Sequence, residues 1–599
     1  MRTFRPSVAA LAVAASLAAP VASAQFSNAY IFGDSLSDAG QYGSRFTTNP
    51  GLTFPMYLAQ RYGITVTPSF TGGTDLAQGG ARMNTPQGGL PPGVPDLSVT
   101  QQVTLLVSKG PLDANALYQI QGGANDVFTL LAQAAAGQIS QAQVQAGTGQ
   151  AAVDLATQVA RLAAGGARYI VVYNLPDLGK TPAFAATGQQ ATGTALTGLF
   201  NSTLNAGIAN LPVIQVNQAL LLNEIVANPS AFGFVNVTTP ACTTASSLQC
   251  TPATLVAPNA AQTYGFADAL HPTTAFAQIA AQQAASMIEG PAKIGILAEV
   301  PLSAEQATFR AIDGRMISSF NQVKRTLPKY ETWVSYDFGN DDWKAPFVDG
   351  SSDQHTISVG FDSKIYPTLF FGGAFGYSEN KGDFGGGTGH FKLRETSGTL
   401  YAGYGTGPWY VGGTLGVGDL DYSDVTRNIQ LGALTRTESG ETKGWHAYVS
   451  AMGGYWFTYN ELQHGPFVRL RYQDIHVHAF AENGADSTAL QYGEQERKSF
   501  ISTLGWQGST QIGIFRPFAR LAWEWEGKDD SRFVSATPVA LSGTYSIPTI
   551  KPDSNWGRYL LGVSVDMGRG AFFLTGEGTS SRDSGNTYGI TVGIRMPIS

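Results

Sequence analysis

Apolar and polar residues follow one pattern in the first 290 residues of the chain and a different one after residue 330. In the first part, short apolar runs alternate with longer segments rich in Ala, Gln and Leu. We interpret the runs as strands and the longer segments as helices, an alternation that predicts a parallel α/β sheet flanked by helices. The expected strands lie at 28–32, 116–123, 167–175 and 211–217.

After residue 330 the pattern changes to strict alternation. In the segment 518–526, Leu521, Trp523 and Trp525 share one face, while Arg520 and Glu524 share the other. A strand with aromatic residues outside and charges inside is typical of an outer-membrane β-barrel, whereas a secreted sandwich would bury its apolar face. The same alternation recurs in segments 356–362, 468–473 and 558–566.

Turn signals divide this second part into about twelve strands, an even number as bacterial barrels require. The tight turns are expected near Pro367, 406–408, Asn460, Phe515 and Arg569. Longer polar segments separate the other strand pairs, and we expect them to be loops outside the cell: 341–354, 380–390, 428–440, 481–495 and 528–555. The sequence therefore predicts a 12-stranded antiparallel transmembrane barrel, with a secreted all-β domain as the alternative.

One helix is expected between the two parts. Ser303 and Gln306 have the spacing of a capping box, and apolar residues recur at helical spacing from Phe309 to Val323. About 20 helical residues span roughly 30 Å, which is long enough to pass through a barrel lumen. An ordinary packed linker helix fits the same spacing.

The chain begins with the features of a secretory signal. Arg2 and Arg5 precede a short apolar run that ends in the small residues 22–24, so we expect export and a mature chain from Gln25. In an exported protein the two cysteines, Cys242 and Cys250, favour a disulfide. The predicted division is a signal peptide 1–24, an α/β domain 25–290, a linker helix 291–328 and a barrel 329–599.

Composition excludes several classes of function. The net charge of −7 gives no basic patch for nucleic acid, and no segment resembles a phosphate-binding loop. No His or further Cys lies near the cysteine pair to complete a zinc site. We therefore expect neither a metal nor a cofactor.

The α/β part carries the candidate chemistry. Ser35 follows the first expected strand in the sequence Gly33-Asp34-Ser35-Leu36, at the edge where α/β sheets collect ligands. A serine nucleophile needs a base, and the first 300 residues contain a single histidine, His271, three residues after Asp268. A capping or surface His at the start of a helix is the plainer interpretation.

Acyl transfer also needs hydrogen-bond donors for the oxyanion. Two segments at strand ends offer them: the glycine pair within 75–81, and Asn125 just before an expected helix. Glycine pairs are common in ordinary turns, so each segment alone carries little information.

Four blocks in this order resemble the GDSL or SGNH esterases and lipases: 33–36, 79–81, 123–126 and 268–271. The resemblance implies that Ser35 is the nucleophile, that Asp268 and His271 complete a triad, and that the oxyanion donors are Ser35 N–H, Gly80 N–H and Asn125. The segment 75–81, which contains the second block, opens with Asp75, where the family usually has Asn.

Joined to the expected barrel, the chain resembles a GDSL-type esterase autotransporter. The resemblance implies a cell-surface enzyme that hydrolyses fatty acyl esters and stays tethered to the outer membrane through a helix in its barrel. The expected partners are an ester or lipid substrate, outer-membrane lipid and the barrel assembly machinery, and the chain is expected to be a monomer. A surface acyltransferase and a non-catalytic adhesin are the alternatives.

Overall fold

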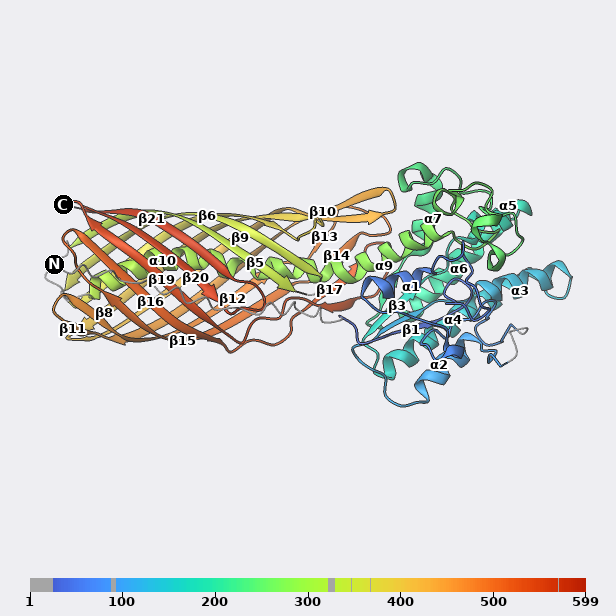
Figure 1. The fold of residues 1–599 in the computed structure, drawn as a ribbon, viewed down its shortest axis with the longest axis horizontal. Coiled ribbons are helices and arrows are strands. Elements are labelled where there is room, and N and C mark those ends of the chain that lie inside the picture. Colours follow the sequence, from blue (N-terminus) through green and yellow to red (C-terminus); the bar gives the residue numbers. More distant parts are fainter. Residues whose placement is uncertain are drawn as a thin grey trace, which may run out of the picture.

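The computed structural model describes residues 25–87, 93–320, 329–345, 347–366, 368–568 and 570–598. An α/β domain occupies one end of an elongated molecule, and a closed β-barrel with a helix inside it occupies the other (Figure 1). Several predictions lie outside the described residues: the signal peptide 1–24, the end of the linker at 321–328, and the turn positions Pro367 and Arg569.

The α/β domain contains a four-stranded parallel sheet in the order β1-β2-β3-β4. Each strand falls within a predicted apolar run: β1 (Ala29–Phe32), β2 (Leu117–Ile120), β3 (Tyr169–Tyr173) and β4 (Ile214–Val216). The strands are short and almost wholly buried, which is why their sequences are continuous apolar runs rather than alternating ones. The predicted parallel sheet is confirmed.

Helices cover both faces of this sheet. One face packs against α1, α7 and α9, and the other against α2, α4 and α6. The helices of the domain are α1 (Phe54–Arg61), α2 (Val99–Val107), α3 (Ala124–Ala135), α4 (Gln141–Ala164), α5 (Pro182–Ala186), α6 (Gln190–Ile208), α7 (Gln218–Ala227), α8 (Ala260–Thr263) and α9 (Thr274–Ile294).

Twelve long antiparallel strands among the described residues form the barrel, and pairing of β10 with β12 closes it. They are β5 (Tyr330–Ala345), β6 (Val348–Tyr366), β7 (Leu369–Asp383), β8 (His390–Thr406), β9 (Trp409–Leu431), β10 (Leu434–Tyr455), β12 (Leu462–Val477), β15 (Gln495–Ser509), β16 (Phe515–Glu526), β19 (Asn555–Asp566), β20 (Ala571–Ser580) and β21 (Thr587–Pro597). The short β11 (Phe457–Tyr459) extends one hairpin.

The faces of the strands are as the alternation predicts. On β16, Leu521 and Trp523 are 64% and 41% exposed on the outside, while Arg520 and Glu524 are buried in the lumen. The outer wall is therefore apolar and the lumen charged, as a barrel in a lipid bilayer requires.

The predicted long loops are largely wrong. Residues 428–440 form the ends of β9 and β10 around a two-residue turn, and 341–354 are almost entirely β5 and β6. Segments 481–495 and 528–555 contribute to a separate four-stranded sheet made of β13 (Phe480–Ala481), β14 (Leu490–Tyr492), β17 (Phe533–Pro538) and β18 (Tyr545–Pro548). One face of these strands is buried, as Tyr492, Val534 and Ile547 show, while the rest of each segment is polar, so the segments resemble loops in composition.

Helix α9 leads from the α/β domain toward the barrel, and a 3₁₀ turn, Gly295–Ala298, connects it to α10 (Val300–Phe320) inside the lumen (Figure 1). The predicted capping box is wrong, because α10 has already begun before Ser303 and leaves no helix start there to cap. No helix among the described residues is long and apolar enough to cross a membrane.

Ion pairs hold α10 within the barrel. Asp313 lies 2.5 Å from Arg469 and 2.8 Å from Arg520 on the barrel wall, and all three are largely buried. Arg310 forms a similar buried pair with Asp337 at 2.5 Å. Buried charges are stable only when they are paired, so these contacts fix the position of the helix in the lumen.

Candidate active site

Ser35 lies in a tight turn immediately after β1. The backbone N–H groups of Ser37 and Asp38 donate to the Asp34 carbonyl at 3.1 and 3.2 Å, and the Leu36 N–H donates to the Asp34 carboxyl at 3.1 Å. Gln121 at the end of β2 donates to the same carboxyl at 2.6 Å. Asp34 therefore fixes the turn, and its burial raises the pKa of its carboxyl above the ordinary value.

The structure brings Ser35 and His271 together across 236 residues of sequence. His271 Nε2 lies 2.9 Å from Ser35 Oγ, and the His271 ring packs against Phe46 with ring centroids 4.9 Å apart. His271 stands in the loop before α9, whose first turn is capped by Thr273. Thr273 rather than His271 is therefore the cap of α9, and the His271 side chain is only 15% exposed.

Asp268 contacts the other nitrogen of the imidazole. Its two carboxyl oxygens lie 2.9 and 2.8 Å from His271 Nδ1. The backbone N–H groups of Leu270 and His271 donate to the carboxyl at 2.9 and 2.8 Å. Burial works to raise the pKa of Asp268, but the hydrogen bonds and the charge of His271 outweigh it, so the pKa lies below the ordinary value.

A further contact to Asp268 comes from the disulfide loop. Cys242 and Cys250 form a disulfide, and Ser247 between them donates its backbone N–H to Asp268 Oδ2 at 2.7 Å. The sequence pointed to the disulfide but gave no sign that its loop supports the acid. Only the fold brings Ser247 to Asp268.

Both candidate oxyanion donors line the same cavity as Ser35. Gly80 adopts a φ of +76°, a left-handed conformation that favours glycine, and its N–H makes no hydrogen bond within the described part of the chain. The Asn125 amide donates one N–H to the Ala81 carbonyl at 3.1 Å, which leaves its second N–H available. The fold therefore brings every predicted site residue of the α/β domain to one place, except the two disulfide cysteines.

The cavity beside Ser35 has a volume of about 350 Å³. Its walls are mainly apolar and come from segments far apart in the sequence, including Phe46, Phe128, Leu222 and Phe276. Part of the lining comes from the segment after β3, through Leu175, Pro176, Leu178 and Thr181. The cavity suits an extended apolar group attached to a reacting carbonyl.

Comparisons with known proteins agree with this arrangement. Residues 30–284 match the family described as GDSL-like lipase/acylhydrolase, and residues 332–579 match the autotransporter beta-domain. Esterase EstA of Pseudomonas aeruginosa is 30% identical over an alignment that covers 94% of this chain and 94% of that protein. The chain belongs to the GDSL-family autotransporter esterases.

Other similar proteins include Lipase 1 of Photorhabdus luminescens, which is 24% identical over 99% of this chain and 98% of its own length. Among solved structures, the translocator domain of autotransporter NalP from Neisseria meningitidis matches with a TM-score of 0.39 and 16% identity. That match covers 49% of this chain and 98% of the other.

Membership of the GDSL-family autotransporters establishes the class of activity and the location. The protein is a carboxylic ester hydrolase, and its barrel is the autotransporter domain that places it in the outer membrane. The adhesin and the secreted all-β alternatives are therefore set aside.

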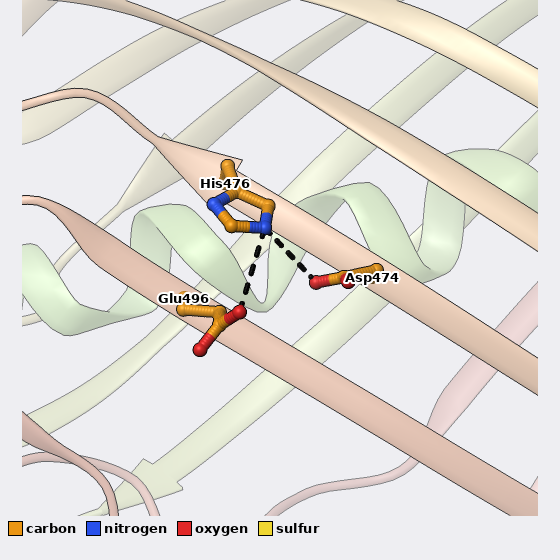
Figure 2. A group of neighbouring side chains, drawn as sticks. All are labelled: Asp474, His476 and Glu496. Carbon is orange, nitrogen blue, oxygen red and sulfur yellow. Dashed lines mark ion pairs between the residues drawn. The ribbon is translucent and has the colours of Figure 1, made fainter.

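One group of metal-ligating side chains occurs among the described residues of this GDSL autotransporter, on the outer wall of its barrel (Figure 2). His476 Nε2 lies 3.1 Å from Asp474 on the same strand and 3.6 Å from Glu496 on the neighbouring strand. Lys498 already pairs with Glu496 at 2.5 Å. These contacts account for the group as a surface ion-pair network.

Proposed function

We propose that this esterase uses Ser35 as nucleophile, His271 as general base and acid, and Asp268 to orient the imidazole. The observation that carries the proposal is the continuous contact from Asp268 through His271 Nδ1 and Nε2 to Ser35 Oγ, at 2.8 and 2.9 Å. An accepting carboxylate at Nδ1 favours the tautomer with the proton on Nδ1, so Nε2 is free to take the serine proton.

The first step forms an acyl-enzyme. Ser35 Oγ bonds to the ester carbonyl carbon while its proton moves to His271 Nε2, and the carbonyl oxygen takes the negative charge. Ser35 N–H, Gly80 N–H and the free N–H of Asn125 donate to that oxygen. When the carbon to alkoxy bond breaks, the leaving alcohol takes the proton from Nε2.

The second step releases the acid. Water attacks the acyl carbon and gives its proton to His271 Nε2, and the same three donors hold the oxyanion. The bond to Ser35 Oγ then breaks, and the serine recovers the proton from Nε2. The acyl group leaves as a carboxylic acid, and the enzyme returns to its starting state.

The proposed substrates are fatty acyl esters. Ser35 lines the cavity of about 350 Å³, and binding of an acyl chain against its mainly apolar walls is favourable because it removes apolar surface from water. No cluster of basic side chains lines this cavity in the part of the chain that the structure describes, which favours an uncharged acyl group over an anionic one.

We also propose the division of the chain given above, with residues 1–24 removed on export, 25–290 as the catalytic passenger, 291–328 as the linker and 329–599 as the translocator. The boundary at 290 lies inside α9, which runs without interruption from the catalytic domain to Ile294. The chain would act as a monomer on the cell surface, inserted by the outer-membrane barrel assembly machinery.

The first experiment compares esterase activity of Ser35→Ala, His271→Ala and Asn125→Ala on a chromogenic short-chain ester. We expect near-complete loss for the first two and a loss of about 10²- to 10³-fold for the third. Ser108→Ala is the matched control, because Ser108 is exposed at the end of α2. Full activity of Ser35→Ala would refute the proposal.

A second measurement separates hydrolysis from acyl transfer. The products are analysed with and without an added acceptor alcohol at a concentration that does not unfold the protein. A hydrolase releases the free acid under both conditions, whereas a surface acyltransferase converts most of the substrate into the new ester.

A further inference from the structure

The peptide unit between Gly79 and Gly80 is held by side chains that the proposed mechanism does not use. The Gly79 N–H, on the preceding unit, donates to Asp38 Oδ2 at 2.8 Å. The Gly79 carbonyl oxygen accepts a hydrogen bond from Tyr42 Oη at 2.9 Å. That carbonyl belongs to the same planar unit as the Gly80 N–H, the proposed oxyanion donor, so a bond to one end of the unit constrains the other.

The Tyr42 ring is itself fixed. It packs edge-to-face against Phe46, with ring centroids 5.6 Å apart at 84°. Both rings lie against Gly79, where a Cβ would come within 2.3 Å of Phe46 and 3.0 Å of Tyr42. Gly79 therefore admits no side chain, and this close contact holds the Tyr42 hydroxyl opposite the Gly79 carbonyl.

Asp38 connects the same loop to the nucleophile turn. One of its carboxyl oxygens accepts from the N–H groups of Gly40 and Gln41 at 2.7 Å each, while the other accepts from Gly79. The Asp38 backbone N–H also donates to the Asp34 carbonyl, so Asp38 links the turn that carries Ser35 to the oxyanion loop by hydrogen bonds.

We propose that Tyr42 is a positioning residue of the oxyanion hole, which orients and polarises the Gly79–Gly80 peptide so that the Gly80 N–H becomes a stronger and better aimed donor. Hydrogen bonds in a chain polarise one another, so a donor at the carbonyl oxygen strengthens the N–H of the same amide. The inference rests on the proposed function, because it requires the Gly80 N–H to donate to the oxyanion.

The Tyr42 hydroxyl keeps its proton throughout the working range of an esterase. Burial, followed by the charges of Asp38 and Asp96, raises the pKa of Tyr42 to about 12. It therefore still donates to the Gly79 carbonyl at neutral and moderately alkaline pH.

The test is Tyr42→Phe, which keeps the ring and its contacts with Phe46 and Gly79 and removes only the hydroxyl. We expect kcat to fall about tenfold, less than the loss of a whole oxyanion donor, with KM within about twofold. A boronic acid, which forms an anionic tetrahedral adduct with the serine, should bind more weakly by about the same factor as kcat/KM falls.

Tyr118→Phe is the matched control. Tyr118 also donates its hydroxyl to a backbone carbonyl, that of Asp113 at 2.9 Å, but at the other end of β2 from the site. This variant removes an equivalent hydrogen bond, and its kcat and boronic acid affinity should stay within about twofold of the parent protein.

A fluorinated tyrosine at position 42 gives an independent readout if Tyr42→Phe accumulates poorly. It keeps the ring and a hydroxyl that ionises at lower pH, and a phenolate cannot donate to the carbonyl. We expect kcat to acquire a new decline at alkaline pH that the parent protein lacks.

The outcomes separate the two proposals. An unchanged kcat in Tyr42→Phe, or a rise in KM with kcat intact, overturns the role of Tyr42 while a loss in Asn125→Ala still supports the oxyanion hole. A boronic acid affinity that stays constant overturns it as well. Full activity of Ser35→Ala would instead refute the proposed function itself.

Discussion

Replacing Asp268 by Asn tests the triad at its least obvious member. Asn keeps the shape of the side chain but turns one acceptor into an NH₂ donor. Oδ1 of Asp268 accepts the backbone N–H groups of Leu270 and His271, and Oδ2 accepts that of Ser247. The amide oxygen satisfies more donors at the Oδ1 position, so the NH₂ group takes the Oδ2 position.

Two consequences follow from that orientation. The new NH₂ group takes the position 2.8 Å from His271 Nδ1 and donates to it in competition with the amide oxygen 2.9 Å away, which favours the tautomer with the ring proton on Nε2, opposite Ser35 Oγ. An imidazole in this tautomer cannot take the serine proton, and loss of the correct tautomer costs about 10³- to 10⁴-fold in kcat. The Ser247 N–H also loses its acceptor, which destabilises the fold by about 1 to 3 kcal/mol.

The assay is the steady-state rate of detergent-solubilised protein on a chromogenic ester, together with the thermal unfolding of each variant. Asp113→Asn serves as control, because Asp113 is a carboxylate on the surface whose removal should change kcat less than about twofold.

The lowered pKa of Asp268 adds a pH signature. The stability that the Asp268 carboxylate contributes to the fold is complete above about pH 4 and is lost as the pH falls through the lowered pKa. Asp268→Asn should show no such loss. A kcat within tenfold of the parent would refute this reasoning.

Three further predictions concern stability. Burial raises the pKa of Asp75 well above its ordinary value, so stability falls as the pH rises above about 4; Asp75→Asn should remove this dependence and stabilise the passenger by about 1 to 3 kcal/mol at pH 8, as measured by thermal unfolding. Replacing Cys242 and Cys250 by Ser opens a short loop and should cost about 2.5 kcal/mol in urea unfolding, with lower activity because the loop supports the triad acid. Asp313→Asn leaves two buried arginine side chains unpaired and should cost about 3 to 5 kcal/mol, seen as a lower temperature for loss of the heat-modifiable band of the folded barrel on a gel.

The sequence predicts the barrel well because the alternation in each strand depends only on what the two faces of that strand contact. Each strand faces lipid on one side and a charged lumen on the other, so residues such as Trp523 and Glu524 must alternate whatever their partners are. The segments beyond the membrane are different. Residues 428–440 are mostly polar although Ile429 and Leu431 on one face are buried, and polarity alone does not distinguish a hairpin from a loop.

The candidate site also contains some residues that the sequence predicts and others that it does not. Ser35, Asn125 and the pair Asp268 and His271 stand in short sequence blocks whose residue types the chemistry requires. Ser247 and Tyr42 act through a backbone N–H and through a bond to a backbone carbonyl, and such roles leave no pattern of residue types. Their positions depend on packing between segments far apart in the chain, which only the folded structure supplies.

The structure explains how Asp75 can stand where the GDSL family usually has Asn. The carboxyl is fully buried, one of its oxygens accepts the Ala77 N–H at 2.7 Å, and its pKa is raised by burial and by Asp38. A protonated Asp has nearly the shape of Asn, so the residue preserves the local fold at a cost in stability.

The most direct test of the account is covalent labelling of intact cells with a membrane-impermeant fluorophosphonate, followed by peptide mapping. The account predicts one adduct on the chain, on the peptide that contains Ser35, absent in Ser35→Ala and formed far more slowly in His271→Ala. Labelling of another residue, or labelling at Ser35 at an unchanged rate in His271→Ala, would contradict the account.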